Sequence, residues 1–112
     1  MPGMRDVPLE VSVGECAQYR AEQPDAILLD VREAWERDIA ALEGSLHIPM
    51  NEIVARASEL DRDRPIYVLC HHGARSASVV RWMRANGFDQ AINVAGGIHE
   101  WSQKVDPGIP TY

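Results

Sequence analysis

The stretch LCHHGARSAS, at positions 69–78, gathers the residue types in this chain that are best suited to chemistry. It places a cysteine, two adjacent histidines, a glycine and an arginine within six positions. A cysteine thiolate is both a nucleophile and a metal ligand, and an imidazole also binds metals. The stretch therefore fits three kinds of site: a metal centre, a phosphate-binding nucleophile loop, or a cysteine that carries sulfur. A buried, inert thiol is the fourth possibility.

The spacing of the candidate ligands argues against a metal centre. A zinc site needs about four ligands whose directions are compatible. Cys70, His71 and His72 are consecutive, so we expect their side chains to diverge. His47 and His99 are isolated in the sequence, and no pair of cysteines has zinc-binding spacing. We therefore expect no metal.

Apolar patterns on both sides place the loop between a strand and a helix. Residues 66–69 (IYVL) are rich in β-forming side chains and predict a strand. Residues 76–86 predict a helix, which follows directly after the loop. Val79, Val80 and Met83 repeat there at helical spacing.

A loop that leads into a helix N-terminus can stabilise negative charge. Backbone N–H groups from His71 to Arg75 can converge on one point, assisted by the helix dipole. Gly73 permits the positive φ of a tight curl, and such a nest binds an anion. Together with Arg75, the nest favours the reactive thiolate of Cys70. The loop therefore predicts a site that holds negative charge on or near the Cys70 sulfur.

Cysteine phosphatases use a similar cradle, with five residues between the cysteine and the arginine. Here four residues, His71 to Ala74, separate Cys70 from Arg75. The smaller ring of N–H donors should fit a tetrahedral phosphate poorly and a single extra sulfur atom well. Phosphatase or arsenate-reductase chemistry remains an alternative. An inert core thiol would explain neither Gly73 nor Arg75.

Short apolar runs alternate with helical stretches along the rest of the chain. Such alternation predicts an α/β fold with a largely parallel sheet, in which ligands sit beyond the carboxyl ends of the strands. Cys70 follows a strand and so lies where a site is expected. The other expected strands are at 9–11, 26–29, 45–48 and 91–94, and the other helices at 13–22, 32–39, 51–60 and 98–103.

The chain has 112 residues, 46% of them hydrophobic, and a formal net charge of −6. This suits one compact domain and disfavours nucleic acid as a partner. Residues 70–88 depart from the acidic average, with Arg75, Arg81 and Arg84 and no Asp or Glu. A local positive patch suggests a small anionic ligand. Alternatively, Arg81 and Arg84 lie on a solvated helix face.

The sequence indicates a cytoplasmic protein with no membrane partner. No apolar run approaches the roughly 18 residues of a transmembrane helix, and residues 1–10 lack a signal-peptide core. The two cysteines, Cys16 and Cys70, are too few for a disulfide scaffold. Cys16 falls in the predicted helix 13–22 and is either a packed residue or a resolving thiol.

Several segments, taken in their order, resemble the rhodanese family of sulfurtransferases. The resemblance covers roughly residues 11–101 and is greatest to the small single-domain bacterial members. The loop pattern Cys-x-x-Gly-x-Arg-Ser is specific, and the ordered set of segments is more specific still. The segments are LLDVREAWE at 28–36, EGSLHIPMNEI at 43–53, CHHGARS at 70–76, RANGF at 84–88 and NVAGGIHEW at 93–101.

This resemblance implies a rhodanese-like three-layer α/β/α domain with a mostly parallel five-stranded sheet. The domain would occupy residues 9–103, between a lead-in at 1–8 and an extended tail at 104–112. It also implies that Cys70 accepts sulfur from thiosulfate or a low-molecular-weight persulfide. A thiol or a protein then takes the sulfur from the Cys70 persulfide, without a cofactor.

The resemblance further assigns residues around the nucleophile. Asp30 and Arg32 match family positions at a strand end near the site, and Arg32 is expected to act mainly through ion pairing. Gly96 and Gly97 match the turn beside the active loop, and all four residues are possible supports of the pocket. The expected persulfide cradle consists of His71, His72, Gly73, Ala74, Arg75 and Ser76.

Two functions remain open on these residues. One is an enzyme that turns over small sulfur donors, and the other is a sulfur-carrier or interaction module with little such turnover. Both need the same loop. His71 and His72 would tune the pocket: because histidine charges below about pH 6.5, we expect thiosulfate turnover to improve toward about pH 6. No such improvement is expected if both side chains merely face solvent.

Overall fold

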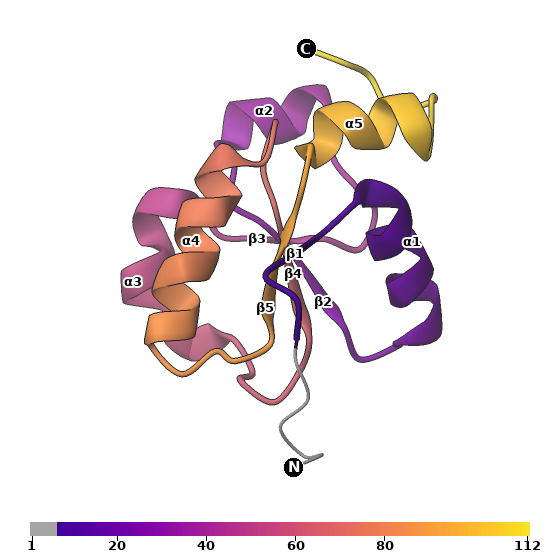
Figure 1. The fold of residues 1–112 in the computed structure, drawn as a ribbon. Coiled ribbons are helices and arrows are strands. Elements are labelled where there is room, and N and C mark those ends of the chain that lie inside the picture. The colour runs from indigo at the N-terminus through magenta and orange to yellow at the C-terminus, as the bar shows by residue number, and fades with distance from the viewer. Residues whose placement is uncertain (1–6) are drawn as a thin grey trace.

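The computed structural model describes residues 7–112 and has a five-stranded, wholly parallel sheet at its centre (Figure 1). The strand order across the sheet is β1–β5–β4–β2–β3, which confirms the predicted parallel topology. Residues 1–6 of the predicted lead-in lie outside the described residues. The strands are β1 (Glu10–Val11), β2 (Ile27–Asp30), β3 (Leu46–His47), β4 (Ile66–Leu69) and β5 (Ala91–Val94).

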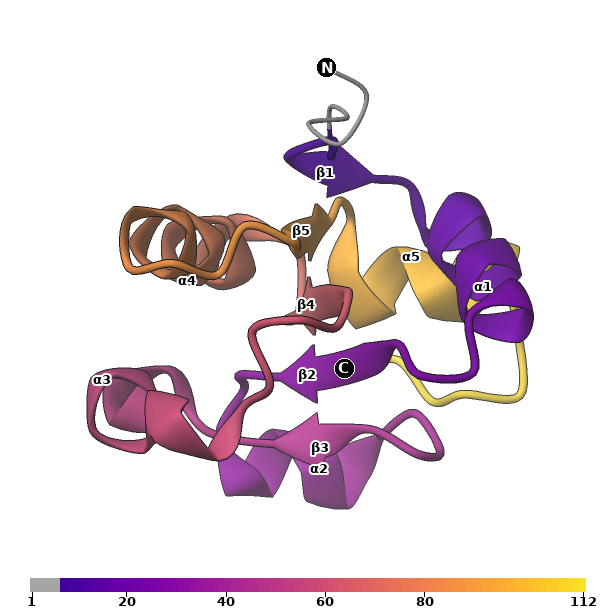
Figure 2. The ribbon, with the colours of Figure 1, turned by 90° about the horizontal axis from the view of Figure 1, so that it is seen from below.

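Helices cover both faces of the sheet and give the predicted three layers. Figure 2 shows α3 and α4 on one face, and α1 and α5 on the other. In Figure 1, α2 lies near the carboxyl ends of the strands. Among residues 7–112, no helix combines the length and apolar character needed to cross a bilayer. The helices are α1 (Val13–Glu22), α2 (Ala34–Ile39), α3 (Ile53–Arg56), α4 (Ala74–Ala85) and α5 (Gly97–Lys104).

The strand that leads to Cys70 supplies side chains to two separate cores. β4 is buried along its whole length, as is usual for a central parallel strand. Val68 and Cys70 join the core that packs beneath α3 and α4. Tyr67 and Leu69 join the core beneath α1 and α5. This alternation directs Cys70 toward the face of the sheet on which α4 begins.

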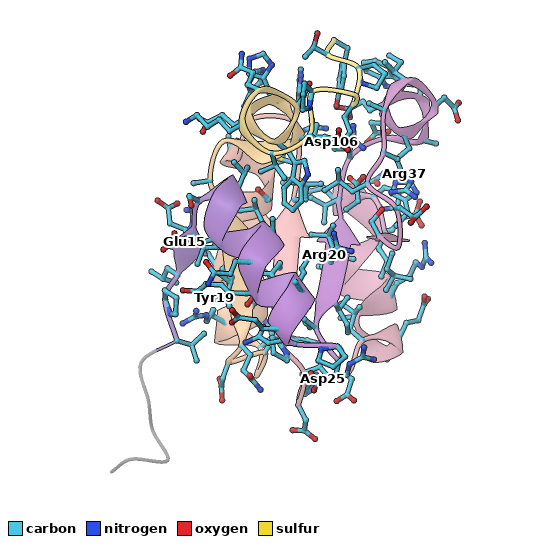
Figure 3. All side chains as sticks on the ribbon, turned by 90° about the vertical axis from the view of Figure 1, so that its right-hand side faces the viewer. Glu15, Tyr19, Arg20, Asp25, Arg37 and Asp106 are labelled. Atoms are coloured by element: carbon cyan, nitrogen blue, oxygen red, sulfur yellow. The ribbon has the colours of Figure 1, made fainter. Side chains whose placement is uncertain are left out.

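α1 shows how local sequence fixes the start of a helix. The hydroxyl of Ser12 accepts the N–H of Glu15 at 3.1 Å, and the Glu15 carboxylate accepts the N–H of Ser12 at 2.9 Å. This reciprocal capping box begins the helix at Val13, as predicted. Figure 3 shows α1, with Glu15, Tyr19 and Arg20 labelled, lying in front of the sheet.

The helix predicted at 51–60 is broken in the structure. It consists of a 3₁₀ turn, the single turn of α3 and a second 3₁₀ turn. The N–H of Glu52 bonds to the Pro49 carbonyl, and the N–H of Leu60 bonds to the Ala57 carbonyl, each three residues back. The 3₁₀ turns are narrower and more stretched than an α-helix, and Ala57 and Leu60 remain in the core.

Two other helices start at different residues than predicted. α4 begins at Ala74 rather than 76, because Gly73 provides its N-cap. α2 begins at Ala34 rather than 32, because Arg32 is fully buried in contacts before the helix. Both differences lie at the carboxyl end of the sheet, beside the loop of interest.

After α5 the chain turns and returns toward α2, where the sequence predicts an extended tail. The hydroxyl of Ser102 donates to the Ile109 carbonyl at 2.6 Å and holds this turn. Figure 3 shows Asp106 of the turn at the same end of the molecule as Arg37 of α2. Tyr112 then packs beside α2 and the loop after β4. The predicted domain limits themselves stay a prediction.

Candidate active site

Cys70 follows β4 at the carboxyl edge of the sheet and is almost completely buried, with 1% of its surface exposed. Its Sγ accepts the N–H of Gly73 at 3.1 Å and the N–H of Ser76 at 3.3 Å. The hydroxyl of Ser76 lies 3.2 Å from the same sulfur. Hydrogen-bond donors stabilise negative charge on the atom they surround. These donors are therefore placed to stabilise a negative charge on the Cys70 sulfur.

Gly73 makes this curl possible. It is the N-cap of α4 and has a φ of 107°, in the left-handed region. Because glycine has no side chain to cap the helix, Cys70 Sγ serves as the acceptor for the Ser76 N–H in the first turn. A Cβ at position 73 would also lie 3.1 Å from the backbone nitrogen of Gly96. Position 73 thus needs glycine for its conformation and for space.

Further backbone donors of the loop are available to a ligand. The N–H groups of His71, His72, Ala74 and Arg75 find no acceptor among residues 7–112. They belong to the same curl and to the first turn of a helix of 12 residues, whose dipole favours an anion. Besides Gly73 and Ser76, which contact the Cys70 sulfur, the loop thus offers four further backbone donors to an anion.

The N-terminus of α5 holds the other side of the loop. The N–H of Ile98 donates to the Cys70 carbonyl at 2.9 Å, and the N–H of His99 donates to the His71 carbonyl at 3.0 Å. A Cβ at Gly97 would lie 2.3 Å from the His71 carbonyl oxygen. The glycine at this position is what allows the helix to approach so closely.

Arg75 is held by an ion pair rather than directed freely at the sulfur. Its guanidinium binds both carboxylate oxygens of Glu36 in α2, at 2.7 and 2.8 Å. These hydrogen bonds outweigh the effect of burial and lower the pKa of Glu36 to about 2. The carboxylate compensates much of the positive charge expected beside Cys70. The nearest donors to the sulfur are therefore backbone N–H groups and the Ser76 hydroxyl.

Asp30 and Arg32 form a fully buried ion pair at the end of β2, with 2.7 Å between nitrogen and oxygen. Asp30 also accepts from Arg37 at 3.0 Å, and Arg32 donates to the Ala40 carbonyl at 2.7 Å. Burial lowers the pKa of Arg32, but hydrogen bonds with Asp30 and Tyr112 raise it on balance. These contacts give Arg32 a structural role in holding α2 beside the site.

Tyr112 forms part of the wall of the site. Its hydroxyl donates to Glu36 at 2.7 Å and accepts from Arg32 at 2.8 Å. Its ring stacks on His71, with centroids 3.9 Å apart and planes 6° from parallel. Burial, together with the neighbouring His72, lowers the pKa of His71. His71 thus stays neutral to a lower pH than a free histidine.

Three histidines gather beside the loop. The sequence predicts that the consecutive His71 and His72 diverge, but their ring centroids lie only 4.0 Å apart. His99, isolated in the sequence, has its ring 4.8 Å from that of His72. The hydrogen bond between His99 and the His71 carbonyl brings α5 to this position.

The sequence does not single out Glu36, Asn93, His99 or Tyr112, although all four lie at or near the site. Asn93 Oδ1 is 2.5 Å from the Ser76 hydroxyl, which in turn contacts Cys70. Glu36, Asn93 and His99 fall within the segments that carry the family resemblance, which is the signal that could have marked them. Tyr112 lies outside those segments.

The remaining candidates lie apart from the sulfur. Cys16 is fully buried in the core on the opposite face of the sheet from Cys70, and burial raises its pKa to about 12. It is a packed residue rather than a resolving thiol. Arg84 donates to the Ala91 carbonyl at 2.8 Å, and Arg81 is exposed. Arg81 therefore lies on a solvated helix face, whereas Arg84 holds the backbone carbonyl of Ala91.

Comparison with known proteins assigns this geometry to a family. Residues 12–104 match the Rhodanese-like domain. The chain belongs to the rhodanese-like family. The crystal structure of a rhodanese-like domain protein from Staphylococcus aureus shares the fold, with a TM-score of 0.79 and 29% sequence identity. That likeness covers 92% of this chain and 97% of the Staphylococcus chain.

Two relatives are named for sulfur chemistry. YrkF of Bacillus subtilis (strain 168), named as a sulfur carrier protein, is 42% identical over 98 residues, which cover 87% of this rhodanese-like chain. The chain spans about half of YrkF, 52% of its length. A protein of Allochromatium vinosum named Sulfurtransferase is 30% identical, over 90% of this chain and 92% of its own. Relatives of this chain thus include a named carrier and a named transferase.

Proposed function

We propose that this rhodanese-like protein is a sulfurtransferase in which Cys70 carries sulfane sulfur as a persulfide. The observation that supports this most directly is the position of the Cys70 sulfur, which accepts hydrogen bonds from Gly73 and Ser76 at the start of α4. The proposed donor is thiosulfate or a low-molecular-weight persulfide, and the proposed acceptor is a thiol or a protein. The two free thiols suit the reducing cytoplasm, which we propose as its compartment.

In the first step, the Cys70 thiolate attacks the outer sulfur of thiosulfate. A new S–S bond forms to Cys70 while the S–S bond of thiosulfate breaks, and sulfite leaves with that electron pair. The product is a Cys70 persulfide anion, so the total charge is unchanged. The N–H groups of His71, His72, Ala74 and Arg75, which have no acceptor within residues 7–112, are available to the terminal sulfur.

In the second step, an acceptor thiolate attacks the terminal sulfur of the persulfide. The S–S bond to Cys70 breaks, and Cys70 departs as the thiolate that began the cycle. The donor and acceptor half-reactions are separate, so ping-pong kinetics are expected. Gly73 and Ser76 donate to the sulfur that leaves, which stabilises the returning thiolate.

A sulfur carrier is the second candidate function. Its support is the similarity to YrkF, a protein named as a sulfur carrier, over 87% of this chain. In that role Cys70 would receive sulfur from one protein and deliver it to another, with little turnover of small donors. The loop geometry serves both roles, because both need a stabilised persulfide.

Intact-mass measurement after exposure to a sulfur donor tests the proposal. We expect the protein to gain about 32 Da, one sulfur atom, and the Cys70→Ser variant to gain nothing. Cys16→Ala is the matched control, because Cys16 is buried on the opposite face of the sheet and should not carry the sulfur. A steady-state assay with thiosulfate and cyanide then separates the roles: turnover indicates the enzyme, and the adduct without turnover indicates the carrier.

Two results would contradict the proposal. One is an adduct that persists in Cys70→Ser or is lost in Cys16→Ala. The other is Cys70-dependent release of phosphate from an aryl phosphate without any sulfur adduct, which would instead indicate phosphatase chemistry.

A further inference from the structure

The wall of the site contains a cluster of histidine nitrogens. One ring nitrogen from each of His71, His72 and His99 lies within 4.8 Å of the other two. Imidazole suits zinc, copper, iron and nickel, and three imidazoles with an open fourth position form one of the known zinc-binding sets. The donor set is therefore that of a borderline transition metal rather than of calcium or magnesium.

Two of the three rings are held in place by contacts that do not use their free nitrogens. The ring of His71 stacks on Tyr112 at 3.9 Å. His99 lies in the first turn of α5, and its backbone N–H is bonded to the His71 carbonyl at 3.0 Å. The positive φ of Gly97, 61°, permits this close approach of helix and loop. The fold thus brings the rings together before any ligand binds.

One ring nitrogen of each of these two histidines lacks a hydrogen-bond partner within residues 7–112. Nε2 of His71 and Nδ1 of His99 are buried, and neither has a hydrogen-bond partner within the described part of the chain. A buried polar group without a partner destabilises the folded protein, and coordination of a metal would supply the missing partner.

Gln103 lies beside the His99 ring, where metal-binding histidines usually have an outer hydrogen-bond partner. Its side-chain amide lies one helical turn from His99, with 3.2 Å between Gln103 Nε2 and His99 Nε2. Turning the amide about its last bond would present the oxygen to His99 Nε2–H. The proton would then stay on Nε2, which leaves the lone pair of Nδ1 directed to a metal.

We propose that His71, His72 and His99 form a binding site for one borderline divalent transition-metal ion, with Zn²⁺ as the reference ion. Zn–N bonds of about 2.0–2.1 Å separate the ligand nitrogens of one tetrahedral ion by about 3.3 Å. The nitrogens now lie within 4.8 Å of one another, so binding requires the rings, above all that of the exposed His72, to move closer together. Cys70 is not one of the ligands, although His71 and His72 belong to the loop that forms the proposed persulfide cradle.

Zinc titration of the untagged protein carrying Cys70→Ser tests the site, because this variant removes the active thiol as a competing ligand. The Zn²⁺ affinity is measured by competition with a chromogenic chelator, and the unfolding midpoint is measured with and without Zn²⁺. We expect one equivalent of Zn²⁺ to bind and to raise Tm. Adding His99→Ala or His72→Ala should weaken binding by at least about tenfold and abolish the rise in Tm.

The fourth histidine supplies the matched control. His47 lies in β3, and its Nε2 contacts the Arg32 carbonyl at 2.7 Å rather than the cluster. His47→Gln should therefore leave the Zn²⁺ affinity unchanged. Gln103→Glu should strengthen binding, because a carboxylate accepts the His99 Nε2–H more strongly than an amide does.

The proposal is overturned if Zn²⁺ binds the Cys70→Ser protein equally well with and without His99 and His72. It is also overturned if zinc binds only when Cys70 is present. Since His72 is exposed, its removal should leave folding intact, and equal Tm values of the metal-free variants verify this. Neither outcome depends on whether the protein transfers sulfur, so failure of this site is distinct from failure of the proposed function.

Discussion

The Cys70 sulfur occupies the position that a capping oxygen takes at many helix N-termini. It accepts the Ser76 N–H of α4 at 3.3 Å, and the Ser76 hydroxyl lies between this sulfur and Asn93 Oδ1. One hydroxyl hydrogen can serve only one of these acceptors at a time. Directed to Asn93, it leaves the hydroxyl oxygen to accept from a Cys70 thiol; directed to the sulfur, it stabilises the thiolate. The hydroxyl can therefore follow the charge on the sulfur through the proposed cycle.

Replacing Ser76 with alanine should slow sulfur transfer. The variant loses one donor to the charged sulfur, and we expect thiosulfate turnover and the rate of Cys70 alkylation at pH 7 to fall by about tenfold, or about 1.4 kcal/mol. Ser78→Ala is the control, because Ser78 is on the same helix and, within residues 7–112, its hydroxyl contacts the Ala74 carbonyl at 3.5 Å and Arg81 at 3.2 Å rather than the sulfur. Equal rates for Ser76→Ala and Ser78→Ala would show that the hydroxyl does not assist.

The contiguous part of the site is predictable, because a strand, a glycine curl and a helix N-terminus follow one another in the sequence. Cys70, Gly73 and Ser76 therefore emerge from the loop motif alone. Glu36 does not, since it lies 39 residues from Arg75 and meets it only because α2 lies near the carboxyl end of the sheet. From the sequence alone, Arg75 is therefore expected to place an uncompensated positive charge beside the sulfur.

The loop after β4 is held between two helix N-termini. α4 supplies the donors to the Cys70 sulfur, and α5 fastens the loop through the carbonyls of Cys70 and His71. The second contact depends on Gly97, because any Cβ there would overlap the His71 carbonyl. The loop therefore keeps its shape around the Cys70 sulfur only if α5 packs against it.

Gly97→Ala should destabilise the protein and impair sulfur transfer together. The added Cβ would lie 2.3 Å from the His71 oxygen at a φ of 61°, and we expect a loss of about 2–4 kcal/mol in urea unfolding. Gly14→Ala is the matched control: its Cβ would lie 4.0 Å from the Ser12 hydroxyl, within α1. That variant should be unchanged or slightly more stable. Equal stability of the two variants would refute the role given to Gly97.

The elements themselves were predictable where one strong local signal decides them. The apolar run of β4 and the Ser12–Glu15 capping box of α1 are such signals, and both elements begin and end as predicted. The segment at 51–60 carries a helical pattern too, but packing against the sheet tightens it into 3₁₀ turns at both ends. The return of the tail after α5 likewise depends on contacts with distant residues.

For the whole molecule, Glu36 connects parts of the chain that are far apart in sequence. It lies in α2, binds Arg75 of α4 and accepts the hydroxyl of Tyr112 from the returning tail. It is 2% exposed, so its charge is retained only because these partners are present. Losing that charge should loosen α2, α4 and the tail together.

Acid should therefore remove the contribution of the Glu36 carboxylate to the free energy of unfolding. The folded pKa of Glu36 is lowered from 4.5 to about 2, chiefly by Arg75. A carboxylate with a lowered folded pKa stabilises the protein above its unfolded pKa, and this contribution disappears as the pH falls from about 4.5 to about 2. We expect it to be about 2 kcal/mol, less than the shift alone implies, because the Arg75 side chain is 36% exposed.

Glu36→Gln isolates this contribution from the other carboxylates. The free energy of unfolding in urea should be about 2 kcal/mol higher for the wild-type protein than for Glu36→Gln at pH 7. This difference should shrink steadily below pH 4.5. Asp38→Asn, an exposed change of the same charge in the same helix, should show no such dependence. A wild-type advantage over Glu36→Gln that stays constant from pH 7 to pH 3 would mean that the stability does not depend on this ion pair.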